Sequence, residues 1–404
     1  MRLANPTRLA WFGAAAVAVI AVILRPGATS VGPVLAEITH GLGLSASLAG
    51  ALTALPGFCF AVAGATAVTL SNKLGTAGTL ALGASAAALG LIARSLVSDP
   101  ASFLALSVLA LLGAGMGNIL VPVFIKRFYP RRQSALMMVY VVGLTTGATM
   151  PGLVTPLFVE SPSGWRTALG LWGVLSAVAV VPWVVWAVLE RTMASATMGP
   201  RSSILSVVRS RRALGLALFF GIQSMQAYVC FGWLAQILRD AGVPAATASL
   251  LMSYYSALGF PAALVMPIVV ARSRDLRPYV VAFAVLLAAG FAGLLLAPLW
   301  SPLLWVTFLG VAGFAFPMAL ALITARTRDP HVTGGLSGLT QSVGYVFSGL
   351  GPLLMGVIHQ VTGGWSVPLV LMAASAVLLL LGGLAVARPG YVDDDLVRVP
   401  TITP

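Results

Sequence analysis

The chain has 404 residues, of which 59% are hydrophobic and only 8% are charged, and its formal net charge is +13. Soluble domains carry about 25% charged residues, so this composition excludes a soluble protein and predicts an integral membrane protein. A positive balance would also suit a nucleic-acid partner, but a membrane protein makes a specific prediction about where its basic residues fall.

Apolar stretches long enough to cross a bilayer recur along nearly the whole chain. A span needs about 20 mostly apolar residues. Twelve stretches of this kind are separated by short polar breaks. The predicted spans cover residues 10–36, 46–70, 76–97, 101–125, 133–157, 165–189, 213–238, 245–270, 279–297, 302–325, 333–358 and 365–387. The sequence therefore predicts an all-α membrane protein with twelve transmembrane helices.

The basic residues predict the orientation. With both termini in the cytoplasm, 19 of the 23 Lys and Arg residues fall in cytoplasmic segments, and three, Arg94, Arg166 and Arg239, fall in outer segments. This bias is the one that the positive-inside rule describes. It argues against a nucleic-acid role, predicts two cytoplasmic termini in a bacterial inner membrane, and leaves only Arg25 of the 23 to explain.

The first apolar run also resembles a secretory signal peptide, because Arg2 and Arg8 precede it. Arg25 and Pro26 stand where a small-residue cleavage site is expected, so we interpret the run as a true span. Cys59 and Cys230 both fall in predicted spans and are interpreted as buried apolar side chains, with no disulfide.

A polar stretch at 190–212 divides the twelve spans into two sets of six. The segment from Gly143 to Trp165 resembles that from Gly344 to Trp365 in composition and length. We predict a six-helix bundle over 1–189, a cytoplasmic linker over 190–212, a second bundle over 213–388 and a cytoplasmic tail over 389–404. Two related halves with the substrate between them, near the middle of the membrane, are a common plan of transporters.

The first span contains a deeply placed charge. Arg25 lies 15 residues after the predicted start of the span and 11 before its end, roughly 22 and 17 Å of helix. An unpaired charge at this depth costs at least about 2.5 kcal/mol. Pro26 and Pro33 interrupt the helix at the same level, and irregular backbone in a membrane is tolerated where it lines a cavity or packs in protein.

No carboxylate is predicted at the depth of Arg25. All ten acidic residues lie in loops, at span ends or in the tail. Carbonyls, water, neutral side chains or an anionic substrate must therefore satisfy the guanidinium. We favour a substrate site for an anion; the alternative is a structural arginine that binds the carbonyls of a neighbouring helix.

Further polar and aromatic groups within spans describe a polar lumen, although each alone suits helix packing equally well. Gln223 and Gln226 share a helix face and stand near the place of Arg25 in the second half. The other candidate substrate-binding residues are Asn118, Tyr140, Trp233, Tyr254, Gln341 and Tyr345.

Four segments resemble, at corresponding places, the cyanate permease family of the major facilitator superfamily, which includes nitroimidazole transporters. They are "LRPGATSVGPVLAEI", "VPVFIKRFYP", "GIQSMQAYVCFGWLAQIL" and "GPLLMGVIHQVTGGW". The resemblance implies the major facilitator fold of two pseudo-symmetric six-helix bundles, alternating access and a small solute. It also implies substrate roles for Arg25 and Gln223.

We therefore predict a secondary transporter of a small, cyanate-like anion. The alternative is an exporter of neutral small aromatics such as nitroimidazoles, for which Trp233, Tyr254 and Tyr255 would suit stacking. Substrate, direction, coupling ion and conformation are left open by the sequence; a monomer without cofactor or metal is expected.

The loop after the second span departs from the superfamily pattern. It contains Lys73 and Gly75 but no aspartate, which puts a charged latch there in doubt. Lys73, Pro26 and Pro33 are candidates for a gating or structural role. Glu37 and His359, at outer ends of spans, are the candidates for coupling to protons, and we expect that a carboxylate in the middle of the membrane does not drive transport.

Two other classes of protein are disfavoured. Ser337 lies in a "GLSG" sequence that resembles a protease pattern, but His359 lies 22 residues away, roughly 33 Å along the same helix, so no catalytic pair forms and no enzyme is predicted. A channel suits the duplicated halves less well than a carrier.

Overall fold

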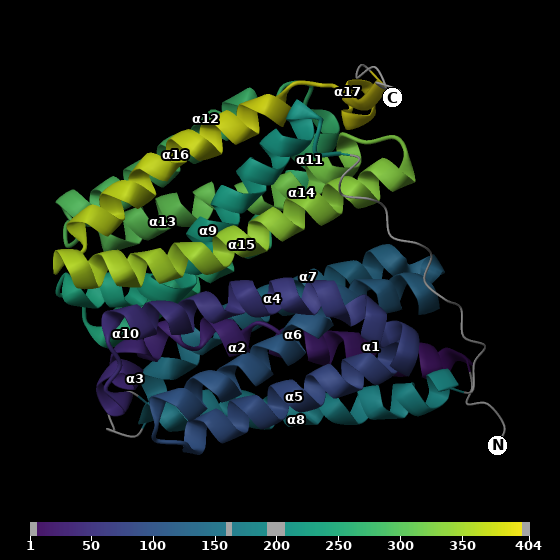
Figure 1. Ribbon diagram of the computed structural model, residues 1–404, viewed down its shortest axis with the longest axis horizontal. Coiled ribbons are helices and arrows are strands. Elements are labelled where there is room, and N and C mark those ends of the chain that lie inside the picture. The colour runs from purple at the N-terminus through teal and green to yellow at the C-terminus, as the bar shows by residue number, and fades with distance from the viewer. Residues whose placement is uncertain (1–5, 159–163, 192–206, 398–404) are drawn as a thin grey trace, which may run out of the picture.

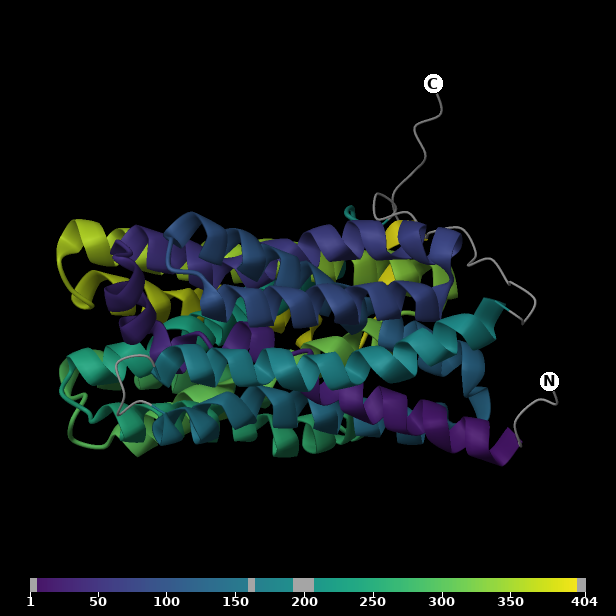
Figure 2. The same ribbon diagram turned by 90° about the horizontal axis from the view of Figure 1, so that it is seen from below.

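The computed structural model describes residues 6–158, 164–191 and 207–397. Within these ranges, twelve helical stretches are long and apolar enough to cross a membrane, and every regular element is helical. The predicted all-α fold with twelve spans is confirmed. Most helices run along the long axis of the molecule, and the two halves of the chain lie side by side (Figures 1 and 2).

The elements follow the predicted spans closely. The first half forms α1 (Pro6–Ile23), α2 (Pro26–Thr29), η1 (Gly32–Val34), α3 (Leu35–Leu42), α4 (Ala46–Leu74), α5 (Thr76–Leu96), α6 (Pro100–Phe128), η2 (Pro130–Arg132), α7 (Gln133–Val154), η3 (Thr155–Leu157) and α8 (Gly164–Arg191). The second half forms α9 (Arg211–Asp240), α10 (Ala245–Ala257), α11 (Gly259–Arg272), α12 (Arg277–Leu296), α13 (Pro302–Ala312), α14 (Ala315–Ala325), α15 (Pro330–Thr362), α16 (Ser366–Ala387) and α17 (Val392–Val397).

The molecule has two ends along its long axis. We call the end where α1 begins and α16 ends the terminal end, at the right of Figure 1, and the opposite one the far end. Most of the predicted linker, residues 192–206, lies outside the described residues, as do residues 398–404 of the predicted tail. Glu190 and Arg191 end α8, and α9 begins at Arg211.

Three spans are broken rather than continuous. The first consists of α1, α2, η1 and α3, because proline at 26 and 33 has no N–H to continue the main-chain hydrogen bonds. The eighth is divided between α10 and α11 at Leu258, and the tenth between α13 and α14 at Gly313 and Phe314. Broken helices in membranes occur where the backbone lines a cavity or is packed in protein.

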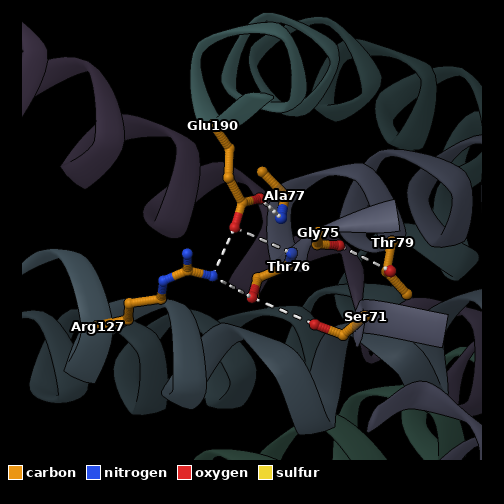
Figure 3. Close-up of polar contacts among 7 residues, drawn as sticks. All are labelled: Ser71, Gly75, Thr76, Ala77, Thr79, Arg127 and Glu190. Atoms are coloured by element: carbon orange, nitrogen blue, oxygen red, sulfur yellow. Dashed lines mark hydrogen bonds and ion pairs between the residues drawn. The ribbon is translucent and has the colours of Figure 1, made fainter. Parts of the chain in front are cut away.

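A buried carboxylate joins three helix ends of the first half at the terminal end (Figure 3). Glu190, in the last turn of α8, accepts hydrogen bonds from the main-chain N–H of Thr76 (3.2 Å) and of Ala77 (2.6 Å). It also pairs with Arg127 of α6 at 2.7 Å. An anion at a helix N-terminus satisfies free N–H groups and the helix dipole, so Glu190 caps α5.

Gly75 makes this close approach possible. It is the single residue between α4 and α5, and its φ of +80° lies in a region that favours glycine. A Cβ atom there would lie 2.9 Å from Oε2 of Glu190. The loop that lacks an aspartate therefore receives its carboxylate from α8, which the sequence pattern of the loop alone could not indicate.

We expect Glu190→Ala to destabilise the protein by about 2 kcal/mol, because it removes a cap and leaves Arg127 without its partner. In a thermal-shift assay on purified protein, the melting temperature should fall by about 2 °C. Asp275→Ala is the control, since Asp275 and Arg277 form an exposed pair at 2.6 Å. Equal melting temperatures for Glu190→Ala and the control would contradict this structural role.

Candidate substrate site

A cavity of about 850 Å³ lies between the two halves. Its walls come from the break in the first span and from α4, α6, α7, α9, α10, α11, α13, α14 and α15. The lining reaches Ala271 and Ala325, the residues next to the terminal-end loops. The breaks in the eighth and tenth spans also face it, at Gly259 and Gly313.

The far end is closed by contacts between the halves. Glu37 of α3 pairs with Arg239 of α9 at 2.8 Å. The main-chain N–H of Ser47 donates to Oε1 of Gln360 at 2.8 Å. Along α4 and α15 the backbones touch, because a Cβ atom on Gly57 would lie only 2.3 Å from the main-chain nitrogen of Gly349. The cavity therefore communicates with one end of the molecule and not the other.

Arg25 carries the charge of this cavity. It is the only charged residue among the described residues that line it. Its Nη1 atom donates to the hydroxyl of Tyr228 at 3.4 Å, a long hydrogen bond across the two halves. None of the five ion pairs found in the described parts of the chain includes Arg25. The guanidinium thus keeps donors for a partner that the protein does not supply.

Aromatic rings line the same cavity as Arg25. The ring of Phe60 meets those of Tyr228 and Tyr345 edge to face, with centroids 6.5 and 6.1 Å apart. Phe231 packs in the same way against Tyr228 and Tyr255, at 5.9 and 5.8 Å. All five rings line the cavity. A solute next to Arg25 would therefore touch ring edges and faces on several sides.

These features have counterparts among known proteins. A model of the Major Facilitator Superfamily matches residues 17–346. The chain belongs to this superfamily. It is a multi-pass membrane protein of a family of transporters, and no enzymatic role is indicated by its relatives.

Three bacterial transporters are similar over most of their length. An uncharacterized transporter of Bacillus subtilis, YycB, is 32% identical over 92% of each chain. The 2-nitroimidazole transporter of Escherichia coli is 30% identical over 93% of this chain and 95% of that protein. The cyanate transport protein CynX of Escherichia coli is 27% identical, with 86% and 89% covered.

Solved structures share the fold. A bacterial homologue of the human lysosomal transporter Spinster, in an inward-facing and occupied conformation, superposes with a TM-score of 0.75 at 17% identity, covering 95% of this chain and 96% of that one. The D-xylose–proton symporter has a TM-score of 0.73 at 14% identity, with 94% and 98% covered. At such identities the likeness concerns the fold alone.

The cavity of this superfamily member brings together five of the polar residues named from the sequence, besides Arg25. Gln223 is buried, and no donor to its Oε1 atom occurs among the described residues. The Tyr140 hydroxyl donates to the carbonyl oxygen of Asn118 at 3.2 Å. The Gln341 amide donates to the Ser337 hydroxyl at 2.8 Å. The complete set is Asn118, Tyr140, Gln223, Gln341 and Tyr345.

Three other predicted residues lie outside the cavity lining. Gln226 donates to the Met372 carbonyl at 3.3 Å and to the Ser375 hydroxyl, so it joins α9 to α16. Trp233 donates to the Pro352 carbonyl at 3.0 Å, and the Tyr254 hydroxyl accepts from Thr307. The two glutamines therefore differ in their surroundings: Gln226 bonds to α16, and only Gln223 lines the cavity.

Glu37, His359 and Lys73, the coupling candidates and one gating candidate, do not line the cavity. Glu37 is paired at the far end, and the ring of His359 lies 4.1 Å from that of Trp365, between the centroids. Lys73 is exposed in the last turn of α4. Pro26 and Pro33 lie in the break of the first span.

Arg94 corrects the sequence-based count of charges. We expected it in an outer segment, but it lies inside α5 and is fully buried, with 0% of its surface exposed. It donates to the Gly27 carbonyl at 3.3 Å and to the Ser30 hydroxyl at 3.2 Å. The predicted span 76–97 already contained Arg94, so its own boundary was the available signal that this arginine does not lie in an outer loop. Arg25 is therefore not the only cation within the spans.

The two glutamines of α9 provide a matched test of the site. We expect Gln223→Ala to weaken binding of a transported solute roughly tenfold, because it removes an amide from the lumen. Gln226→Ala should leave solute affinity unchanged and lower the melting temperature, because it removes the bond between α9 and α16. Binding by isothermal titration calorimetry and thermal-shift assays separate the two; the opposite pattern would mean that the lumen is misplaced.

Proposed function

We propose that this transporter carries a small, cyanate-like anion across the bacterial inner membrane by alternating access, with Arg25 binding the negative group. The observation that supports this most is the charge balance of the cavity. Arg25 is the only charged residue found among the described lining residues, and its one side-chain hydrogen bond there is the long one to Tyr228.

The physical argument concerns desolvation. A charge taken out of water is costly unless it is paired and hydrogen-bonded. A guanidinium has five N–H donors in a planar fork, which suits an oxyanion or another small planar anion. A solute that brings the missing negative charge receives hydrogen bonds and an opposite charge from Arg25 in place of its hydration by bulk water. This interaction provides affinity and selects against cations.

The direction in which the cavity opens fits one state of a transport cycle. The bias of basic residues predicts cytoplasmic termini, and the cavity reaches the terminal end while the far end is closed. We therefore assign the structure to an inward-open state. Opening of the far end would separate Glu37 from Arg239 and α4 from α15, as rocking of two halves around a central site requires.

A second candidate function has its own support. The five rings that line the cavity suit a neutral aromatic solute, and a relative of similar length is a 2-nitroimidazole transporter. A nitro group is planar and carries partial negative charge on its oxygens, so the same guanidinium could orient it. The size of the cavity, about 850 Å³, admits both kinds of solute.

Removal of the charge distinguishes the two candidates. We expect Arg25→Ala to weaken cyanate binding by a factor of about 100, since truncating one member of a desolvated charge pair costs 2 kcal/mol or more. Arg25→Lys should retain part of the affinity. Isothermal titration calorimetry on purified protein, with cyanate and with 2-nitroimidazole, measures the effect.

The matched control is Arg166→Ala, because Arg166 binds the carbonyls of Ser95 and Val97 away from the cavity. Wild-type protein that binds 2-nitroimidazole but no cyanate, with little change in Arg25→Ala, would favour the neutral solute. Unchanged binding of cyanate in Arg25→Ala would overturn the site assignment.

The ion pair at the far end allows a test of proton coupling. We propose that Glu37 closes the far end by pairing with Arg239 and does not carry a proton. Glu37→Gln and Arg239→Gln should then have the same effect: slower counterflow in proteoliposomes with the pH dependence of uptake kept. The exchanged pair Glu37→Arg with Arg239→Glu should restore the rate. Loss of pH dependence in Glu37→Gln, with exchange intact, would instead identify Glu37 as the proton-binding group.

A further inference from the structure

The broken segment of the first span rests on a second arginine. Arg94 comes from the last turn of α5, and its side chain is wholly buried. Its two terminal nitrogens donate to the Gly27 carbonyl and to the Ser30 hydroxyl, both just after Arg25 in the chain. Burial of a guanidinium is costly, so its place under the break calls for an explanation.

Hydrogen bonds hold α2 from two sides. This single turn, Pro26–Thr29, is completely buried. On one side it is tied to Arg25, because the main-chain N–H groups of Ala28 and Thr29 both donate to the Arg25 carbonyl at 3.0 Å. On the other side it is tied to Arg94. The short turn α2, directly after Arg25, is thus held between the Arg25 carbonyl and the Arg94 guanidinium.

Packing around Arg94 brings no negative charge. None of the ion pairs in the described ranges includes it, and its Nε atom has no acceptor there. Its Cζ atom lies 6.0 Å from the centre of the Phe103 ring. Asp99, five residues further along the chain, caps α6 through the N–H of Ser102 instead. The positive charge of Arg94 therefore remains uncancelled beside the break.

We infer that Arg94 is a positioning and field-setting residue of the anion site: it holds α2 so that Arg25 faces the cavity, and its own charge raises the positive potential there. The inference rests on the proposed function in one respect, namely that the solute is an anion. The effect of Arg94 on the electrostatic potential inside the cavity does not depend on the identity of the solute. An arginine whose charge was screened from the cavity would influence folding but not this potential.

A reporter cysteine in the cavity measures the potential without a substrate. Ala227 lines the cavity next to Tyr228, so Ala227→Cys can be placed in a background where the buried Cys59 and Cys230 are alanine. The rates of reaction with an anionic and a cationic methanethiosulfonate reagent give a ratio that follows the local potential. We expect Arg94→Gln to lower the anion-to-cation ratio about tenfold, as the loss of one poorly screened charge nearby requires.

Two variants control for other effects. Arg94→Lys keeps the charge and should keep the ratio within about threefold of the parent. Arg166→Gln removes a charge at the same end of the same half and should leave the ratio unchanged, since Arg166 binds the end of α5 and not the break. An unchanged ratio in folded Arg94→Gln, or an equal drop in Arg166→Gln, would overturn the inference.

Transport kinetics provide the second readout. With cyanate in proteoliposomes, Arg94→Gln should raise KM roughly tenfold with kcat changed less than about threefold, the size of effect seen when a residue that orients a binding group is removed. If Arg94→Gln gives as much folded protein as the wild type and its KM for cyanate is unchanged, the inference is contradicted. If wild-type protein does not bind cyanate, the proposed function fails, while the reagent ratio still decides the role of Arg94.

A failure of Arg94→Gln to fold would be visible as loss of the monodisperse peak in size-exclusion chromatography. Ser30→Ala then serves in its place, because it keeps the charge and removes one of the two acceptors of Arg94. Looser positioning of α2 should lower the reagent ratio about twofold to threefold. A ratio equal to that of the parent would overturn the positioning role.

Discussion

The structure is organised around positive charge that the protein itself does not neutralise. Arg25 and Arg94 both lie within spans of the first half, and neither belongs to an ion pair in the described parts of the chain. A buried guanidinium such as that of Arg94, or a half-buried one such as that of Arg25, would normally recruit a carboxylate. Here the break in the first span supplies the Gly27 carbonyl and the Ser30 hydroxyl to Arg94, while Arg25 reaches only the Tyr228 hydroxyl of α9 and otherwise faces the cavity. The break in the first span is therefore the local structure on which the placement of both arginines depends.

The two halves contribute differently to the cavity. The first half supplies the charge at Arg25, and the second half supplies an amide at Gln223 and the tyrosine hydroxyl of Tyr228 that reaches Arg25. This asymmetry places the only charged group among the described lining residues on one side of a cleft between the two halves, which the proposed alternating access would move relative to each other. A solute that bridges charge and amide would contact both halves, which is how binding can be linked to rocking.

Stability at the terminal end depends on a separate set of carboxylates. Glu190 caps α5 and pairs with Arg127 in the first half (Figure 3). In the second half, Asp394 and Asp395 of α17 pair with Arg328 and Arg212. These three acidic residues are thus used at helix ends, where the aqueous boundary lowers the cost of the charges, and no acidic residue occurs among the described residues that line the cavity.

Local sequence was sufficient for the spans, because each helix must by itself present about 20 apolar residues to the bilayer. It was also sufficient for the break at Arg25 and Pro26, since proline disrupts a helix in any context. Such features depend on the composition of one segment. The separation of Gln223 from Gln226, the capping of α5 by Glu190 and the burial of Arg94 depend on contacts between segments far apart in the chain. Only the packed structure decided them, because the rotation of a helix about its axis and the depth of its last turn are determined by its neighbours.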